Sequence, residues 1–379
     1  MAADARVSVD EGSEQQPSHR ALDNNYDSAT YKPAAFRLDD INIDLISVII
    51  TTATAAAAVI SILLLHQPPA KLIAPATAAA ASVLALRLFL PRPNPPRGLV
   101  LITGGSSGIG AEMAYIFAEK GHDLILVGRN EEQLEAVKNN VKEKFARSAY
   151  TVAADLSRPG AAKELYDHVT NHGFTVDVLV NGAGLGGVGD VLEQSIEFAE
   201  RMTTLNCISL VQLTQLFGKD MVKQGRGWML QISSVGGWMA SPGQNIYHAT
   251  KHYVRAFSEA LSLELRTYPG IVNTQLMPGP THTQFVTRAH AEETFMMAAS
   301  GAVEDPKAVA MAGYQALCKG KRMVFGSWNS AATALMMQLA PRSVHLTFAA
   351  MMNSPLRGRM RMKEPEKDQK ARGSDLKER

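Results

Sequence analysis

A short apolar segment, GLVLI at residues 98–102, runs directly into the glycine-rich turn TGGSSGIG at residues 103–110, and a helix-forming stretch beginning AEMAYIF follows. Glycine is needed where a backbone turns tightly and where it must approach a ligand without an intervening Cβ. The opening turn of the following helix offers unpaired N–H groups and the positive end of the helix dipole. A glycine cluster alone is often only a loop, but a strand before it and a helix after it predict a site for the pyrophosphate of a dinucleotide.

The alternation of short apolar runs with helical stretches continues to residue 326. The candidate strands are GLVLI, DLILV, AYTVAA, VDVLV, WMLQI, IVNTQLM and RMVFG. Residues 131–144 and 257–268 have helical composition. Strands that are apolar along nearly their whole length and separated by helices predict an α/β fold, a doubly wound parallel sheet with helices on both faces. We therefore expect one α/β domain over residues 97–326.

The N-terminal part of the chain has a different composition. Residues 1–40 are polar and lack apolar periodicity, which predicts a disordered acidic tail. Residues 41–92 are a predicted membrane anchor, because residues 45–65 carry no charge and match the roughly 20 residues that cross a bilayer core. The second apolar stretch, residues 72–90, is Ala-rich and contains Pro75, so crossing, re-entry and an interfacial position stay open.

The first apolar segment has two other interpretations, a buried core helix and a secretory signal. A signal peptide is disfavoured because a long polar stretch, with no cationic segment, precedes the apolar run. A core helix is disfavoured because the segment lies outside the α/β domain. Arg87, Arg92 and Arg97 crowd the end of the anchor that faces the α/β domain, and the positive-inside tendency then places the domain in the cytosol, with the endoplasmic reticulum as the expected membrane.

The C-terminal part begins after residue 326. Residues 327–356 are apolar and Met-rich but are interrupted by Pro341 and Arg342, which predicts a helical extension of two short amphipathic helices. They either pack on the domain or lie in a membrane surface. Residues 357–379 are a charged tail, either a solvated end or a segment whose basic residues contact anionic lipid.

Charge and cysteine usage exclude several classes of function. The formal net charge is +2, so the chain lacks the field that nucleic-acid binding usually needs. The only cysteines, Cys207 and Cys318, cannot build a disulfide framework, and we interpret them as small buried apolar residues. No CxxC pair or His/Cys cluster indicates a metal site.

The end of the second candidate strand indicates which dinucleotide binds. DLILV ends in Gly128, Arg129 and Asn130, about 20 residues after the glycine turn. A site for NAD normally has an acidic residue here, which holds the ribose 2′-hydroxyl. No acidic residue is present, and a guanidinium can grip a 2′-phosphate with two hydrogen bonds. Unless Arg129 is simply a surface residue, this contrast predicts NADP(H).

A possible proton-transfer set follows in the order Ser234, Tyr247, Lys251. The free phenol of tyrosine has a pKa near 10, a poor match to neutral pH. Lys251 lies four residues after Tyr247, so on a helix they share a face, and an ammonium there is expected to lower the phenol pKa. Ser234, just past a strand end, would hydrogen-bond a substrate oxygen as charge develops on it. Tyr-x-x-x-Lys alone is usually a helix surface, but its spacing from Ser234, the preceding VNGAG at residues 180–184 and the following Pro-Gly at residues 278–279 together predict a catalytic site.

With these motifs in this order, residues 97–326 resemble the short-chain dehydrogenases/reductases. The motifs that carry the resemblance are TGGSSGIG, Asp155 after the third strand, VNGAG, Asn206 in TTLNCIS, Ser234 in QISSVGG, YHATK and MPGPTHT. The resemblance implies a Rossmann fold, a nicotinamide cofactor and a catalytic set of Asn206, Ser234, Tyr247 and Lys251, with Asn206 supporting a water in the proton relay. It also implies a homodimer through the helix that carries YHATK.

The resemblance further implies a set of cofactor-binding residues. They are Thr103, Gly104, Ser106, Ser107, Gly108, Ile109, Gly110, Arg129, Asp155, Leu156, Asn181, Tyr247, Lys251, Pro278, Gly279, Thr281 and Thr283. Among them, Asp155 corresponds to the adenine contact and Lys251 to the nicotinamide ribose contact. Asn181 matches the family's asparagine, although the common NNAG reads NGAG here.

The substrate is expected to be hydrophobic. Residues 235–246, with Trp238 and Met239, should border it, as should Phe285, Val286, Phe295, Met296 and Met297. The alternative for the Phe and Met residues is helix core. Together with the anchor, these residues predict an NADPH-dependent reductase of a lipophilic ketone or alcohol, such as a lipid, steroid or terpenoid.

Two weaker resemblances and one other class of function stay open. The C-terminal part is similar to DltE-like reductases. The anchor resembles that of hydroxysteroid dehydrogenases, very-long-chain 3-oxoacyl-CoA reductases and 3-ketosphinganine reductases, so a ketosphinganine or 3-oxoacyl substrate is an alternative. A non-catalytic, membrane-tethered NADP(H)-binding scaffold is the alternative of another class.

Overall fold

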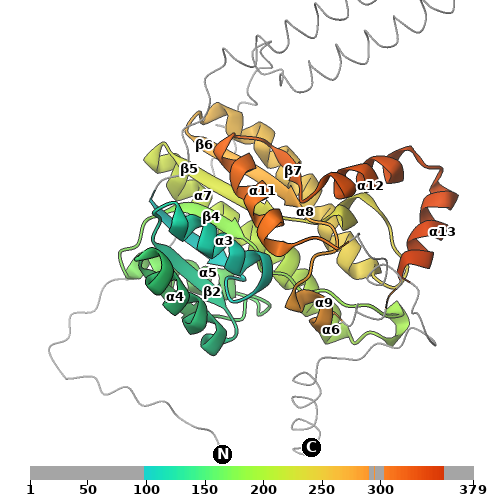
Figure 1. The fold of residues 1–379 in the computed structure, drawn as a ribbon, viewed down its shortest axis with the longest axis horizontal. Helices are drawn as coiled ribbons and strands as arrows, with labels where there is room; N and C mark the ends of the chain where they lie inside the picture. The colour runs from blue at the N-terminus through green and yellow to red at the C-terminus, as the bar shows by residue number, and fades with distance from the viewer. Residues whose placement is uncertain (1–97, 290–293, 295–302, 354–379) are drawn as a thin grey trace, which may run out of the picture.

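The central feature of the structure is a parallel sheet of seven strands in the order β3-β2-β1-β4-β5-β6-β7 (Figure 1). The strands are β1 (Leu99–Thr103), β2 (Leu124–Gly128), β3 (Ala149–Ala153), β4 (Val176–Asn181), β5 (Gly227–Ile232), β6 (Ile271–Met277) and β7 (Met323–Phe325). Each neighbouring pair is parallel. The strand order reverses beside β1, and ligands of such sheets bind at that reversal, outside the carboxyl ends of the strands. The predicted doubly wound α/β fold is confirmed.

The computed structural model describes residues 98–289, 294 and 303–353. The predicted N-terminal tail, membrane anchor and charged C-terminal tail lie outside these residues. Among the helices of the described ranges, none combines the length and the apolar character needed to cross a bilayer.

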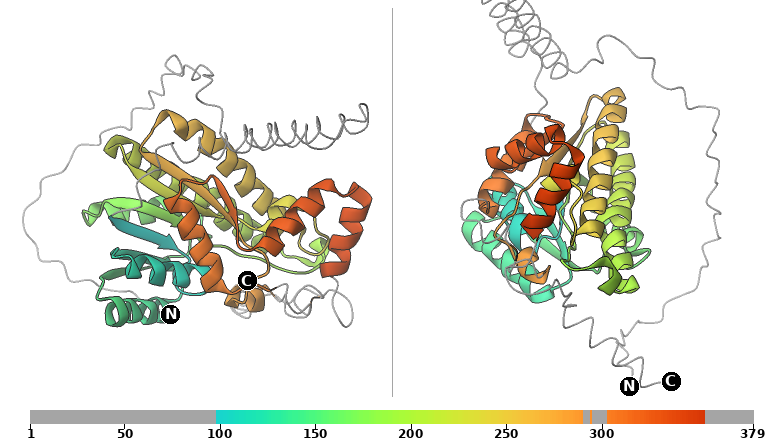
Figure 2. Two further views of the ribbon diagram at one scale, coloured as in Figure 1. Left: turned by 45° about the horizontal axis from the view of Figure 1, so that its top comes forward. Right: turned by 90° about the vertical axis from the view of Figure 1, so that its right-hand side faces the viewer.

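One face of the sheet is covered by α3 (Gly108–Glu119), α4 (Glu131–Phe145) and α11 (Pro306–Cys318). The core there joins β-strand residues such as Ile102 and Leu230 to Phe117 of α3 and Val309 of α11, all buried. Figure 2 shows these helices on the opposite side of the sheet from the green and gold helices. The apolar sides of three helices pack on a largely apolar strand surface and fix the position of the glycine turn that begins α3.

The other face is covered by α5 (Ala161–Asn171), α7 (Leu210–Gln224) and α8 (Asn245–Glu264) (Figures 1 and 2). A second apolar core, including Leu165, Phe217 and Met229, lies on this face. Helix α8 begins twelve residues before the helical stretch predicted at 257–268, and a short 3₁₀ turn, η5 (Leu265–Thr267), follows it. Its early start places residues 247 and 251 on one helix.

The carboxyl ends of the strands carry the short elements that surround the site. These are η2 (Val191–Glu193), α6 (Ile196–Thr203), η3 (Thr204–Ser209), η4 (Val235–Trp238) and α9 (Gln284–Arg288). After β7 the chain forms two helices, α12 (Trp328–Leu339) and α13 (Arg342–Asn353). Both project beyond the sheet in Figure 1.

Candidate active site

In the turn between β1 and α3, Gly104, Gly108 and Gly110 leave no room for a side chain. Gly104 and Gly108 have positive φ angles of 72° and 56°. A Cβ on Gly110 would lie 2.2 Å from the carbonyl oxygen of Gly104, and a Cβ on Gly108 would lie 2.9 Å from Cγ2 of Thr283. Ser107, the N-cap residue of α3, makes no side-chain capping hydrogen bond. The turn therefore fits the pyrophosphate of a dinucleotide, with the uncapped start of α3 facing outward as a donor set.

Two predicted cofactor residues have side chains that bind the protein itself. Thr103 Oγ1 accepts hydrogen bonds from the backbone N–H groups of Gly182 at 3.0 Å and Ala183 at 3.1 Å, so it ties the end of β1 to the loop after β4. Asn181 Nδ2 donates to Thr214 Oγ1 and to Gln231 Oε1, both at 2.9 Å. Both side chains are buried, and their role in the structure is to fix the floor of the site.

The carboxyl end of β2 brings together the residues predicted to select the cofactor. A Cβ on Gly128 would lie 3.2 Å from Ser106 Oγ, so a glycine here lets the two turns pack closely. Arg129 is exposed. Burial raises the pKa of Asp155, but hydrogen bonds from Ser157 and the positive charges of Arg129 and Arg201 outweigh it and hold the pKa below its ordinary value. Asp155 is therefore ionised and lies within the field of Arg129.

Ser234 follows β5 and caps the short helix η4. Its Oγ accepts a hydrogen bond from the N–H of Gly236 at 3.0 Å and lies 3.5 Å from the carbonyl oxygen of Pro278. The N–H of Val235 donates to the same carbonyl at 2.9 Å. Ser233 points elsewhere, since its Oγ donates to the carbonyl of Lys251 at 3.1 Å. The hydroxyl of Ser234 is thus held in place between η4 and the loop after β6.

Tyr247 and Lys251 lie one helical turn apart near the start of α8. The ammonium Nζ of Lys251 is 5.7 Å from the centroid of the Tyr247 ring and donates to the carbonyl of Ile232 at 3.0 Å. Burial raises the pKa of Tyr247 to about 12, although a hydrogen bond with Ser234 opposes the shift. Burial also lowers the pKa of Lys251 to about 8.

The predicted lowering of the phenol pKa by Lys251 is wrong for this structure. The sequence shows that a cation lies one turn away, but the loss of hydration on burial is the larger effect on both groups. Tyr247 is therefore a neutral phenol at pH 7. A neutral phenol in contact with Ser234 can give a proton to an oxygen that gains negative charge.

Asn206 lies in η3, a single π-helical segment between α6 and α7. Its Oδ1 accepts from the N–H of Leu185 at 2.8 Å, and its Nδ2 donates to the carbonyl of Leu185 at 2.8 Å and to Thr250 Oγ1 at 3.0 Å. Both amide protons are used, so the side chain ties the loop after β4 to α8. Single π-turns inside helices are frequent at functional sites.

The segment after β6 carries Pro278, Gly279, Thr281 and Thr283, and sequence reasoning missed its main anchor. Glu304 Oε2 accepts from the N–H of Gly279 at 3.0 Å, while Oε1 accepts from the hydroxyls of Ser327 and Ser330 at the start of α12. Residues 281 and 304 also form an isolated parallel β-bridge. This carboxylate joins the predicted nicotinamide segment to the C-terminal helices.

The predicted substrate border is only partly assembled in the described residues. The ring centroid of Phe285 is 5.4 Å from that of Tyr247, so an apolar side chain lies beside the phenol. Trp238 packs against other residues. The centroid of its ring lies 3.8 Å from the guanidinium carbon of Arg255, and its Nε1 donates to Met277 Sδ at 3.1 Å. Residues 295–297 lie outside the described ranges. Within those ranges, no three His, Cys, Asp or Glu side chains cluster as metal ligands would.

The family model described as short chain dehydrogenase matches residues 98–294. The chain is similar to dehydrogenase/reductase SDR family member 7 of Homo sapiens, with 31% identity over 201 residues, 52% of this chain and 58% of that protein. It is also similar to the very-long-chain 3-oxoacyl-CoA reductase of Mus musculus, with 32% identity over 47% of this chain and 57% of that protein. The chain thus spans less than two thirds of these two relatives. For dehydrogenase/reductase SDR family member 7B of Danio rerio, 30% identity extends over 69% of this chain and 89% of that protein.

Two solved structures extend the comparison. A short-chain dehydrogenase from Sphingobium yanoikuyae in complex with NADPH has 29% sequence identity and a TM-score of 0.57, covering 65% of this chain and 98% of its own. A bulky-bulky ketone specific alcohol dehydrogenase from Comamonas testosteroni has 25% identity and a TM-score of 0.54, covering 66% and 96%.

Proposed function

Because this chain belongs to the short-chain dehydrogenase family, whose members are oxidoreductases of alcohol and ketone groups with a nicotinamide cofactor, we propose that it is an NADPH-dependent reductase of a hydrophobic ketone. One observation carries the proposal. The contact between Ser234 and Tyr247, with Lys251 one turn away, lies at the same edge of the sheet as the glycine turn. A dinucleotide bound at that turn would extend toward these side chains.

A bound nicotinamide dinucleotide supplies the hydride, and the protein supplies orientation and the proton. Ser234 hydrogen-bonds the substrate carbonyl oxygen, where the developing negative charge makes that bond stronger. Tyr247, a neutral phenol because burial raises its pKa to about 12, donates its proton to the same oxygen. Lys251 stabilises the phenolate that remains. Asn206 positions α8 through Thr250.

The residues that would hold NADP(H) come from four loops. The backbone of the glycine turn (Gly104, Ser106, Ser107, Gly108, Ile109 and Gly110) would bind the pyrophosphate. Arg129 would bind the 2′-phosphate, and an acidic residue that would repel it is missing from the end of β2. Asp155 with Leu156 would bind the adenine, and residues 278–283 would bind the nicotinamide amide. The NADPH in the Sphingobium enzyme supports this choice over NAD(H).

We also propose that the substrate is lipophilic and that the chain is membrane-bound. Phe285 beside Tyr247 supports an apolar substrate, and the uncharged segment 45–65 supports an anchor in the endoplasmic reticulum with the domain in the cytosol. A long-chain 3-oxoacyl or ketosphinganine substrate is the second candidate, favoured by the likeness to the mouse 3-oxoacyl-CoA reductase. A homodimer through α8 and the likeness of the C-terminal part to DltE-like reductases stay predictions.

The test is NADPH binding and oxidation by the detergent-solubilised full chain, with a panel of steroid, terpenoid, sphingoid and 3-oxoacyl ketones, against NADH. We expect tighter binding of NADPH than NADH and turnover on one class of ketone. Tyr247→Phe should keep NADPH binding and lose turnover by about 10²–10⁴-fold, because it removes the proton donor. Tyr253→Phe, an exposed tyrosine on the same helix, is the matched control and should keep both.

Three other outcomes would decide against the proposal. Binding of NADPH without turnover of any ketone would favour a non-catalytic scaffold, and so would a cellular role that Tyr247→Phe leaves unchanged. Failure to bind either nucleotide would reject both the reductase and the scaffold.

A further inference from the structure

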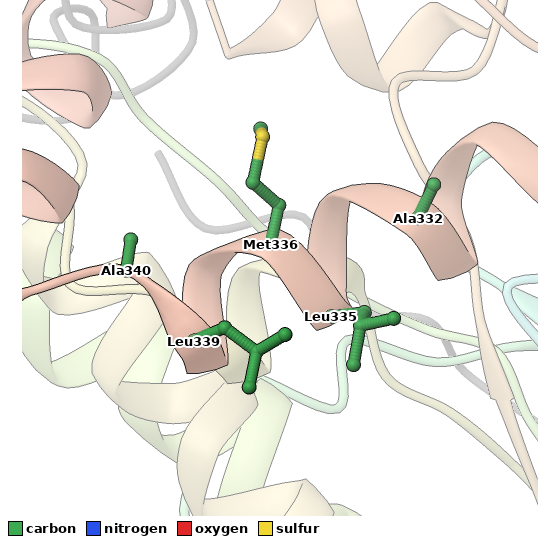
Figure 3. Close-up of a pocket in the computed structure, with 5 residues that line it drawn as sticks. All are labelled: Ala332, Leu335, Met336, Leu339 and Ala340. Carbon is green, nitrogen blue, oxygen red and sulfur yellow. The ribbon is translucent and has the colours of Figure 1, made fainter. Parts of the chain in front are cut away.

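The outward face of α12 carries an apolar stripe. Trp328, Leu335 and Leu339 expose 79%, 57% and 76% of their surface, and their spacings of seven and four residues place them on one side of the helix. Ala332, Leu335, Met336, Leu339 and Ala340 line a shallow hollow of about 460 Å³ there (Figure 3). The opposite side of α12, through Ala334 and Met337, is buried against the domain. Large apolar side chains exposed side by side on one element indicate an interaction surface.

Helix α13 has the same two-sided arrangement. Val344 and Met351, seven residues apart, expose 56% and 50% of their surface. On the buried side, Asn353 pairs with the loop that precedes Tyr247, accepting from Gln244 Nε2 at 3.0 Å and donating to Ser241 Oγ. The inner sides of α12 and α13 are thus fixed to the domain by specific contacts. We call the exposed apolar side chains of the two helices, Trp328, Leu335, Leu339, Val344 and Met351, the α12–α13 face.

The sequence that contains these two helices is basic. From residue 306 to residue 363 the sequence contains nine Lys or Arg residues and no Asp or Glu. Arg342, at the junction of α12 and α13, is exposed. Apolar side chains combined with cations, and with no carboxylate in the same stretch, match the chemistry of a bilayer surface with anionic headgroups.

We propose that the α12–α13 face lies in the surface of an anionic lipid bilayer. The indole of Trp328 has an apolar body and one N–H donor, which suits the boundary between headgroups and acyl chains. A second copy of the chain fits less well. An isologous contact would place this face against itself, and cations would meet cations with no acidic partner from the stretch. The inference rests on the exposed apolar side chains of the two described helices and on the basic sequence that contains them, and it does not require residues 45–65 to span the bilayer.

The experiment uses the three tryptophans of the full chain, of which Trp228 is buried and Trp328 is largely exposed. The chain and its Trp328→Phe variant are reconstituted in vesicles of phosphatidylcholine and phosphatidylserine, with and without lipids brominated on their acyl chains. The difference in emission between chain and variant isolates Trp328. An interfacial helix buries its apolar side about 5–10 Å into the bilayer, so brominated lipid should quench the difference signal about twofold.

Controls separate this surface from the anchor and from the enzyme. Trp238→Phe, elsewhere in the domain, should leave the quenchable signal intact, and Leu339→Asp should reduce it. If the cations contribute to binding, brominated vesicles of phosphatidylcholine alone should quench Trp328 emission less than vesicles that contain phosphatidylserine. Trp328 emission that stays accessible to aqueous acrylamide and unquenched by bromine, in protein that floats with the vesicles, would overturn the proposal and leave the anchor standing. Protein that does not float with the vesicles would also overturn the proposal. So would a blue shift of Trp328 emission that depends on protein concentration and not on lipid concentration. NADPH oxidation in detergent measures the enzyme activity separately from the contact with the bilayer.

Discussion

Glu304 is predicted to hold the segment after β6 in place, and its replacement tests that role. Glu304→Ala removes the acceptor of three hydrogen bonds, one from the Gly279 N–H and two from the hydroxyls of Ser327 and Ser330. A hydrogen bond to a charged group contributes about 1.5–3 kcal/mol. Since Glu304 is half-buried, the lower end applies, and three bonds then amount to about 4.5 kcal/mol of unfolding free energy. Glu304→Gln, which keeps an acceptor oxygen without the charge, should lose roughly 1–2 kcal/mol.

The assay combines urea unfolding with NADPH titration of the detergent-solubilised chain. If Gly279 is positioned by this carboxylate, both variants should weaken NADPH binding in the same order as they lower stability. Glu164→Ala is the control, because its carboxylate pairs with Arg158 at 2.6 Å with both side chains about 60% exposed, and such surface pairs contribute about 0–1 kcal/mol. A loss below 1 kcal/mol for Glu304→Ala, or a large loss with unchanged NADPH affinity, would refute the reasoning.

Two further predictions concern the glycine turn and the buried histidine of α8. Gly110→Ala should weaken NADPH binding at least about tenfold, because its Cβ would lie 2.2 Å from the Gly104 carbonyl oxygen. Gly218→Ala is the control, since its Cβ would lie 3.7 Å from the nearest atom, and it should change neither NADPH affinity nor the unfolding free energy. Burial lowers the pKa of His248 to about 4, so between pH 6.5 and 4 the unfolded chain binds a proton that the folded chain does not. The unfolding free energy should then fall by about 3 kcal/mol as the pH drops through this window. In urea titrations at pH 4.5 and 7, His248→Gln should reduce this loss of unfolding free energy, whereas the exposed His172→Gln should leave it unchanged. An equal pH dependence of the unfolding free energy in both variants would contradict the assignment of the effect to His248.

The sheet was predictable from sequence because parallel strands covered on both faces are apolar along their whole length. All seven apolar runs became strands, including the short RMVFG run that forms β7. The start of α8 was not predictable in the same way. The residues it buries are mostly polar, His248, Thr250, Lys251, Ser258 and Ser262 beside Val254, so buried apolar residues give little signal for where the helix begins.

The candidate site was predictable where the residues follow a local motif, and not where distant segments meet. Ser234, Tyr247 and Lys251 were found from their spacing, and the structure brings them together. Glu304 has no local signal, because Gly279 lies 25 residues before it and Ser327 lies 23 residues after it. The prediction of a lowered pKa for Tyr247 was wrong for a related reason. The spacing of residues reveals a neighbouring charge, but it does not reveal the loss of water around the buried phenol.

The α12–α13 pair is part of the site's architecture and not an appendage to it. Through Glu304, α12 holds the segment with Gly279 on one side of the candidate site. Through Asn353, α13 holds the residues that lead into Tyr247 on the other side. Any contact that orders the outer face of these helices therefore acts on two loops of the site at once. A bilayer in that position would bring a lipophilic ketone to the same edge of the sheet at which the hydride and the proton are delivered.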